Sequence, residues 1–137
     1  MNKYLGSYRV RLADTDAAGL LFFSRIYDYA HACYEDFMQQ NQLELCDILK
    51  QGEFLLPIIG SSAEYKQPLS LGQQINISLL VENISTSSFT LAYRFLNQEN
   101  QLLASVKTIH VSISMQSKAK IALPENLLKV LCLNEQV

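Results

Sequence analysis

The spacing of apolar residues along this chain of 137 residues changes from strand-like to helical and then back to strand-like. Between Ser7 and Ala13 apolar and polar residues alternate, which predicts a half-buried strand. From Ser24 to about Asn41 the apolar residues recur at helical spacing, which predicts a long amphipathic helix with Ser24 as its N-cap. The predicted buried stripe of this helix consists of Ile26, Ala30, Cys33 and Phe37, widened by Tyr27, Tyr34 and Met38.

After the long helix most of the pattern alternates. Strands are predicted at residues 61–66, 75–81, 89–95 and 102–115. Within the last of these the apolar phase changes between Val106 and Ile109, which predicts a bulge or a change of neighbouring strand. Shorter helices are predicted over residues 43–50, ended by Gly52, and from Pro124 to Leu131.

These elements together predict an α+β protein in which one long helix covers an antiparallel sheet of about five strands. No repeat, low-complexity segment or linker divides the chain, so we expect residues 1–137 to form one domain. A single sheet with one covering helix leaves strand edges and apolar surface exposed. We therefore expect the chain to pair with another copy of itself.

Composition narrows the classes of function. The chain is 49% hydrophobic and 18% charged with a net charge of −2, which argues against disorder and against general nucleic-acid binding. Cys33, Cys46 and Cys132 form no CxxC pair, so we expect small, buried, reduced side chains rather than a zinc site or a disulfide framework. Neither a signal-peptide core nor a run of membrane-spanning length is present, which favours a cytoplasmic protein without a membrane partner.

The turn between the first strand and the long helix carries the most suggestive chemistry. Asp14 and Asp16 both lie in this turn, with Gly19 just before the helix. If the backbone is extended there, the two acids project to the same side. A helix start offers unpaired N–H groups that can hold an oxyanion, while a carboxylate beside it can attack a carbonyl or activate water. The alternative is that both acids merely cap the turn, which Asp often does.

The same stretch resembles the signature of the 4-hydroxybenzoyl-CoA thioesterase family of hot-dog folds. The matching run is Asp14-Thr-Asp-Ala-Ala-Gly-Leu-Leu-Phe-Phe-Ser-Arg-Ile-Tyr. A second block, residues 52–75, and the segment His110-Val-Ser-Ile resemble later parts of the family pattern. Within the family the chain resembles the 1,4-dihydroxy-2-naphthoyl-CoA thioesterases of phylloquinone and menaquinone synthesis.

The resemblance implies a role for three positions. Asp16 matches the catalytic carboxylate, the amide of Phe23 matches the donor that polarises the thioester carbonyl, and Gly19 matches the turn glycine that admits the substrate. Relatives that act on short aliphatic acyl groups often carry His at the position of Phe23, and many members carry Asn at the position of Arg25. The expected reaction is therefore hydrolysis of an aromatic acyl-CoA, with no metal and no cofactor because coenzyme A is a good leaving thiolate and is itself part of the substrate.

Further candidate substrate contacts are less specific. We expect Phe22, Tyr27, His31 and Glu64 to face the substrate, and Lys118 and Lys120 to meet the phosphates of coenzyme A. Each of these residues also has an ordinary structural interpretation, as part of a helix or strand surface or of a solvated loop. By resemblance, two copies join their sheets with active sites at the dimer interface, and two dimers pair.

Three rival functions remain at this stage. A non-catalytic acyl-binding module has no need of Asp16. A hot-dog hydratase or dehydratase pairs an acid with a histidine, and the turn that carries Asp14 and Asp16 contains no histidine. An aliphatic acyl-CoA or acyl-carrier-protein thioesterase would differ in the residues that line its acyl pocket.

Overall fold

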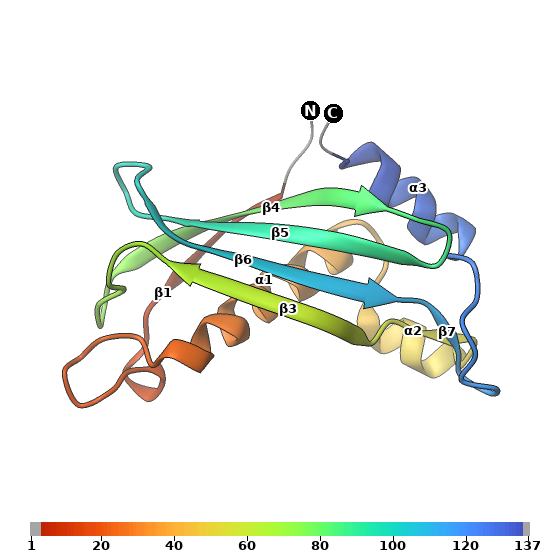
Figure 1. The fold of residues 1–137 in the computed structure, drawn as a ribbon, viewed down its shortest axis with the longest axis horizontal. Coiled ribbons are helices and arrows are strands. Elements are labelled where there is room, and N and C mark those ends of the chain that lie inside the picture. Colours follow the sequence, from red (N-terminus) through yellow and green to blue (C-terminus); the bar gives the residue numbers. More distant parts are fainter. Residues whose placement is uncertain (1–3, 136–137) are drawn as a thin grey trace.

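A computed structural model describes residues 4–135. Its main feature is an antiparallel sheet whose five strands lie in the order β1-β4-β5-β6-β3 (Figure 1). The strands are β1 (Tyr4–Arg9), β3 (Ile58–Tyr65), β4 (Gln74–Ile84), β5 (Ser88–Leu96) and β6 (Leu102–Val111). Alternate residues of β4 and β5 are buried, as their patterns predict, because successive side chains of a strand point to opposite faces.

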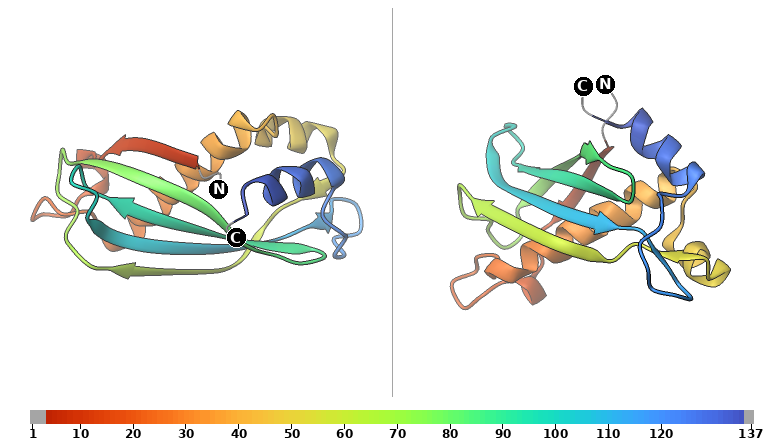
Figure 2. Two further views of the ribbon diagram at one scale, coloured as in Figure 1. Left: turned by 90° about the horizontal axis from the view of Figure 1, so that it is seen from above. Right: turned by 45° about the vertical axis from the view of Figure 1, so that its right-hand side comes forward.

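The long helix α1 (Ile26–Gln40) packs on one face of this sheet, and Figure 2 shows the sheet curving around it. The predicted buried stripe is confirmed, since Ile26, Ala30, Cys33 and Phe37 are all buried. Ser24 is not the N-cap, however. A 3₁₀ turn (Phe23–Arg25) leads into α1, and no side chain caps the start of either segment. The first N–H groups of the helical run are thus left for other partners.

Smaller elements gather near one end of the sheet (Figure 1). The helix α2 (Leu45–Gln51) ends at Gly52, whose φ of 68° lies in the left-handed region that glycine adopts easily. The strands β2 (Phe54–Leu55) and β7 (Ile113–Ser114) pair with each other, and α3 (Glu125–Leu133) follows Pro124. Of the cysteines, only Cys33 is buried, so the prediction that all three are buried is wrong for Cys46 and Cys132; all three are free thiols.

The predicted phase change within the last long strand is also wrong. Val106, Thr108 and His110 are buried in unbroken alternation, whereas Ile109 faces outward. Two polar residues occupy inward positions because they find partners there: the Thr108 hydroxyl lies 2.9 Å from His110 Nε2 and 3.1 Å from the Tyr93 hydroxyl. The change of neighbour occurs later, after Val111, where the chain leaves β6 to pair β7 with β2.

The strand β3 lies at an edge of the sheet, and most of its side chains are exposed. It pairs only with β6 within the described residues, with an irregularity between Ile58 and Gly60. One long helix wrapped by a five-stranded antiparallel sheet is the hot-dog arrangement that the signature implies. The sequence prediction of an α+β hot-dog fold is therefore confirmed.

Candidate active site

Asp16 begins the tight turn that leads from the first strand toward α1. Its Oδ1 accepts hydrogen bonds from the amides of Ala18 at 2.8 Å and Leu20 at 3.1 Å. Across residues 4–135, hydrogen bonds reach only this one carboxylate oxygen, so Oδ2 is left unbonded on an exposed side chain. Asp16 is thus a turn-capping residue and also a carboxylate with one oxygen available for chemistry.

Gly19 closes the same turn. Its φ of 77° is one that residues with a side chain rarely adopt, and its N–H donates to the Asp16 carbonyl at 3.1 Å. The Gly19 carbonyl accepts from the amide of Leu71, which ties the turn to the connection before β4. The glycine is therefore required first by the backbone conformation that presents Asp16.

Asp14 has a different environment from Asp16, although only one residue separates them. It is 4% exposed, and its Oδ2 accepts from the Tyr29 hydroxyl at 2.6 Å and from Arg11 Nε at 3.4 Å. The backbone is not extended across both acids, because residues 12–14 form a 3₁₀ turn. The expectation that the two carboxylates project to one side is not met: Asp14 is buried, and its Oδ2 accepts both of these bonds inside the protein.

The start of the helical run lies beside this turn. The Phe22 amide donates to the Asp14 carbonyl at 2.9 Å, whereas the following amides begin the 3₁₀ turn without a capping side chain. The Tyr65 hydroxyl, from the end of β3, donates to the Phe23 carbonyl. Burial, and secondarily the neighbouring Tyr27, raise the pKa of Tyr65, which keeps it a neutral donor. The edge strand is therefore bonded directly to the helix start.

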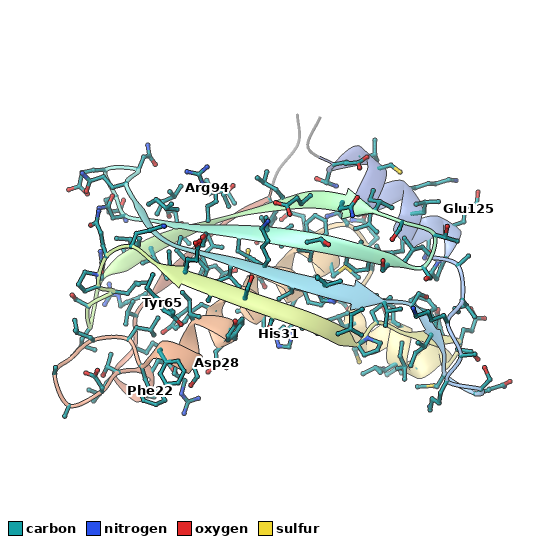
Figure 3. The ribbon with its side chains drawn as sticks, in the orientation of Figure 1. Phe22, Asp28, His31, Tyr65, Arg94 and Glu125 are labelled. Carbon is teal, nitrogen blue, oxygen red and sulfur yellow. The ribbon has the colours of Figure 1, made fainter. Side chains whose placement is uncertain are left out.

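These elements enclose an open hollow of about 540 Å³. Its lining comes from the turn, from the helix start and from the end of β3: Asp16, Leu20, Leu21, Phe22, Phe23, Tyr65, Lys66, Gln67, Pro68 and Leu69. Figure 3 shows Phe22 and Tyr65 at this end of the molecule. Phe22 and Phe23 are 46% and 66% exposed with their ring centroids 5.0 Å apart, so the mouth of the hollow is aromatic.

The structure brings together some of the predicted site residues and separates others. Asp16, Phe22 and Phe23 share the hollow, and Tyr27 lies near enough to Tyr65 to affect its pKa. Glu64 is exposed on β3, 3.9 Å from Lys66, and does not line the hollow.

Three other candidates lie elsewhere in the chain. His31 lines a separate groove farther along α1. Lys118 and Lys120 lie on the exposed loop after β7. That loop and the turn before α1 occupy opposite ends of the molecule (Figure 1). Within one chain, neither lysine can therefore meet a ligand at Asp16.

Sequence reasoning missed the contribution of the segment from Tyr65 to Leu69. These residues lie some fifty positions after the turn and carry no local pattern of catalytic chemistry. The only signal was their place in the second block of the family resemblance. They reach the hollow because β3 runs along the sheet edge and ends beside the helix start.

Comparisons with known proteins agree with this geometry. Residues 10–131 match the thioesterase-like superfamily. The chain belongs to that superfamily. It is 30% identical to the 1,4-dihydroxy-2-naphthoyl-CoA hydrolase of Synechocystis sp., over 96% of both chains, and 34% identical to that of Microcystis aeruginosa, over 86% of this chain and 85% of the relative.

A solved structure of a 1,4-dihydroxy-2-naphthoyl-CoA thioesterase from Synechocystis superposes on this member of the thioesterase-like superfamily with a TM-score of 0.90. The sequence identity is 30%, and 96% of each chain is covered. Across residues 4–135 no three His, Cys, Asp or Glu side chains cluster as a metal site would require. Within the same residues, none of the helices combines the length and the apolar character that crossing a bilayer demands.

Proposed function

We propose that this protein hydrolyses an aromatic acyl-CoA thioester to the free acid and coenzyme A, with 1,4-dihydroxy-2-naphthoyl-CoA as its substrate. The observation that carries this proposal is the unbonded Oδ2 of Asp16, exposed in a hollow shared with an uncapped helix start. The relatives named above act on this same compound, and they match along nearly the whole chain.

In this proposal the helix start and Asp16 act on opposite sides of the thioester. The Phe23 amide donates to the thioester carbonyl oxygen and stabilises the negative charge that develops there. One such donor is worth roughly 10²–10³ in rate. Asp16 Oδ1 stays fixed by its two amide donors, which directs Oδ2 toward the carbonyl carbon or toward a water.

Two routes lead to the same products. Asp16 Oδ2 attacks the carbonyl carbon, the C–S bond breaks to release the thiolate, and water then cleaves the mixed anhydride. Alternatively, Asp16 takes a proton from a water that attacks the carbonyl, and the thiolate leaves directly. Neither route uses a metal or a cofactor. Hydrolysis in ¹⁸O-labelled water under single-turnover conditions separates the direct route from an anhydride that water opens at the Asp16 carboxyl carbon, because only then does the product carry an unlabelled oxygen from Asp16 and the label enter the enzyme.

The hollow disfavours a hydratase or dehydratase. Those enzymes pair an acid with a histidine, and both histidines of the chain, His31 and His110, lie outside the lining of this hollow. Exposed aromatic rings at its mouth also favour an aromatic over a short aliphatic acyl group. An acyl-carrier-protein thioesterase on the same fold is the second candidate, and the substrate screen below includes it.

We also propose that two copies pair through β3. This edge strand of eight residues exposes its backbone and several apolar side chains, among them Ile59, which is 61% exposed. A long, exposed, apolar strand edge is the kind of surface that a second copy covers. We further propose that two such dimers pair to form a tetramer. We also propose a cytoplasmic location, because a reducing compartment keeps the three cysteines as free thiols.

The test is a thiol-release assay across aromatic and aliphatic acyl-CoA and acyl-carrier-protein thioesters. Asp16→Asn is assayed beside Asp47→Asn, which makes the same chemical change on the exposed surface of α2. We expect turnover of 1,4-dihydroxy-2-naphthoyl-CoA that Asp16→Asn abolishes and Asp47→Asn leaves unchanged. Wild-type protein that binds acyl-CoA without releasing thiol would instead establish the non-catalytic acyl-binding module.

A further inference from the structure

A second hollow, of about 400 Å³, lies between α1 and the edge strand β1. We call it the β1–α1 hollow, and its lining consists of Tyr8, Arg9, Arg11, Asp28, Tyr29 and Ala32. None of these residues lines the hollow of Asp16. Because β1 and β3 are opposite edges of the sheet, the β1–α1 hollow also lies away from the strand through which we propose that two copies pair. Its volume is typical of small-molecule sites, which span about 300–1,000 Å³.

Two features of the fold keep this space open. Asp28, Ala32 and Asp36 are spaced four residues apart on α1 and so share one face of the helix, where Ala32 leaves room between the two acids. On the strand, the Tyr8 ring lies back over Gly6, where an added Cβ would come within 2.7 Å of that ring. Asp36 Oδ2 accepts from the Tyr8 hydroxyl at 2.6 Å and holds the ring there. The hollow is therefore built into the packing of β1 against α1.

The two tyrosines offer their rings rather than their hydroxyls to a ligand. The Tyr29 hydroxyl donates to Asp14 Oδ2 at 2.6 Å and accepts from the Arg11 amide at 3.0 Å. Burial, and then the bond to Asp14, raise the pKa of Tyr29, which keeps that proton on the hydroxyl. The Tyr8 proton is engaged by Asp36. The two rings meet edge to face with their centroids 6.5 Å apart, so together they form an aromatic wall.

The polar contacts of the hollow come from guanidinium groups. Among residues 4–135 the Arg9 side chain makes no hydrogen bond or ion pair, although it lines the hollow. Arg11 Nε lies 3.4 Å from Asp14 Oδ2, and the Arg11 side chain is 72% exposed, so this pair is weak enough to be shared with a second carboxylate. Asp28, the acid in the lining, is already paired with Arg25 at 3.0 Å. Two cations are thus available to an anionic ligand.

These features together fit a small aromatic carboxylate. A flat ring packs against the tyrosine wall, and a carboxylate takes the paired N–H groups of a guanidinium. The acids Asp28 and Asp36 on the helix side disfavour further negative charge in the same place. A ligand with one carboxylate therefore suits the β1–α1 hollow better than the several phosphates of coenzyme A do.

Asp14 connects the β1–α1 hollow to the hollow of Asp16. Its side chain bonds to Tyr29 and Arg11, which line the first hollow, and its carbonyl accepts from the amide of Phe22, which lines the second. A ligand carboxylate that draws Arg11 away removes one of the two groups that hold the Asp14 carboxylate. The helix start, which is bonded to the Asp14 carbonyl, is then less firmly fixed.

We propose that the β1–α1 hollow binds a small aromatic carboxylic acid and that the bound acid slows turnover at Asp16 through Asp14. The identity of the natural ligand rests on the proposed function, because hydrolysis of an aromatic acyl thioester releases an acid of this chemistry. The product then inhibits from a place that the substrate does not occupy. All lining residues come from one chain, so each protomer carries its own site.

The first experiment tests the class of ligand by calorimetry. The probes are 1-hydroxy-2-naphthoate and the uncharged 1-hydroxy-2-naphthamide, titrated into protein that carries Asp16→Asn and is supplied with excess 2-naphthoyl-CoA to fill the Asp16 hollow. Arg9→Gln is compared with Arg94→Gln, the same change on an exposed residue of β5 outside the hollow. We expect Arg9→Gln to weaken binding of the carboxylate roughly 10-fold and to leave the amide within about twofold. Equal effects on both probes, or no effect, would overturn the proposal.

The second experiment tests the place of binding. Ala32→Phe fills the hollow from α1, and Ala119→Phe makes the same change on the exposed loop after β7. We expect only Ala32→Phe to abolish binding of 1-hydroxy-2-naphthoate, with both variants folded by circular dichroism. Adenosine 3′,5′-bisphosphate, added as a competitor, should not displace the probe. Displacement would show that the hollow holds the nucleotide end of coenzyme A and would refute the assignment to an aromatic acid.

The third experiment tests the coupling to Asp16. Thiol release by otherwise wild-type protein is measured at saturating thioester with increasing 1-hydroxy-2-naphthoate. We expect kcat to fall by roughly fivefold, and this inhibition to be lost in Arg9→Gln and kept in Arg94→Gln. Inhibition that saturating thioester removes completely would overturn the coupling. Wild-type protein that releases no thiol would contradict the proposed function instead, and the calorimetric result would still decide whether the site exists.

Discussion

The turn at Asp16 and the interior beneath it use the same kinds of polar group for opposite purposes. In the exposed turn, Asp16 has one oxygen held by backbone amides and one left free. In the interior, Asp14 is bonded to Tyr29 and Arg11, and His110 is bonded to Thr108. A free oxygen at a surface hollow can act on a substrate, whereas a buried group that is bonded to its neighbours and shielded from substrate stabilises the fold. The comparison therefore predicts which substitutions alter turnover and which alter stability.

The largest expected effect is on catalysis at Asp16. Asp16→Asn should lower the kcat of thioester hydrolysis by at least ~10³-fold, because an amide neither attacks a carbonyl nor accepts a proton from water. The asparagine Oδ1 still accepts from the Ala18 and Leu20 amides, so the melting temperature should stay within about 2 °C of wild type. A variant that keeps its activity would assign the chemistry to another group.

The pH dependence of stability should come from His110, one of the buried polar groups described above. Burial, with a smaller contribution from His31, lowers the pKa of His110 from 6.5 to about 4, although the backbone of Leu56 opposes this. The unfolded chain thus binds more protons between pH 6.5 and 4, and the folded state loses stability as the pH falls through that window, by on the order of 3 kcal/mol.

Urea unfolding of wild type and of His110→Gln at pH 7, 5.5 and 4.5 measures this contribution. The variant is less stable at pH 7 because it loses the ring packed parallel to Phe89, but its stability should fall less steeply with acid. Equal slopes for the two proteins would mean that other groups account for the acid sensitivity.

Asp14→Asn should show the reverse of Asp16→Asn. Replacing this buried carboxylate weakens its bonds to Tyr29 and Arg11 and should lower the free energy of unfolding by about 2 kcal/mol. The kcat of the folded fraction should change less than tenfold. Denaturant titration measures the loss of stability, and an activity assay on the same samples measures kcat. A large loss of kcat in fully folded protein would instead show that Asp14 takes part in catalysis.

The smallest expected effect concerns Gly19. An alanine there meets no atom within 4 Å, but the φ of 77° is strained for any side chain, at a cost of about 1 kcal/mol. Relaxation of that strain shifts Asp16, so kcat should fall modestly and the free energy of unfolding should fall by no more than about 1 kcal/mol. Gly72→Ala, at a similar φ of 81° in open space outside the site, is the matched control and should leave kcat unchanged.

The sequence predicted the helix and strands well because their periodicities were strong. The stripe of α1 and the alternation of β4 and β5 are confirmed almost residue by residue. It failed in β6, because Thr108 and His110 are polar yet buried, and their bond to each other and the bond of Thr108 to Tyr93 account for that. It also failed at Ser24, where a 3₁₀ turn replaced the expected cap.

For the site, the sequence supplied the two acids, the glycine and the helix start, since all of them lie within a dozen adjacent positions. It placed His31, Glu64 and the pair Lys118 and Lys120 near the substrate, whereas none of them lines the hollow of Asp16 in the folded chain. Side chains that meet across a fold do so through strand order and register, which local spacing does not encode. The role of Asp16 remains a prediction that both the pattern and the hollow support.

By itself, then, the order of residues determined the elements and the turn that carries the reacting group, because both follow from short-range periodicity and backbone geometry. Only the tertiary structure decided that Asp14 is buried and bonded while Asp16 is exposed with an oxygen free, and that Tyr65 from the sheet edge bonds to the helix start. The physical reason is that burial depends on which surfaces meet when the chain closes. Two aspartates one residue apart can therefore acquire opposite roles.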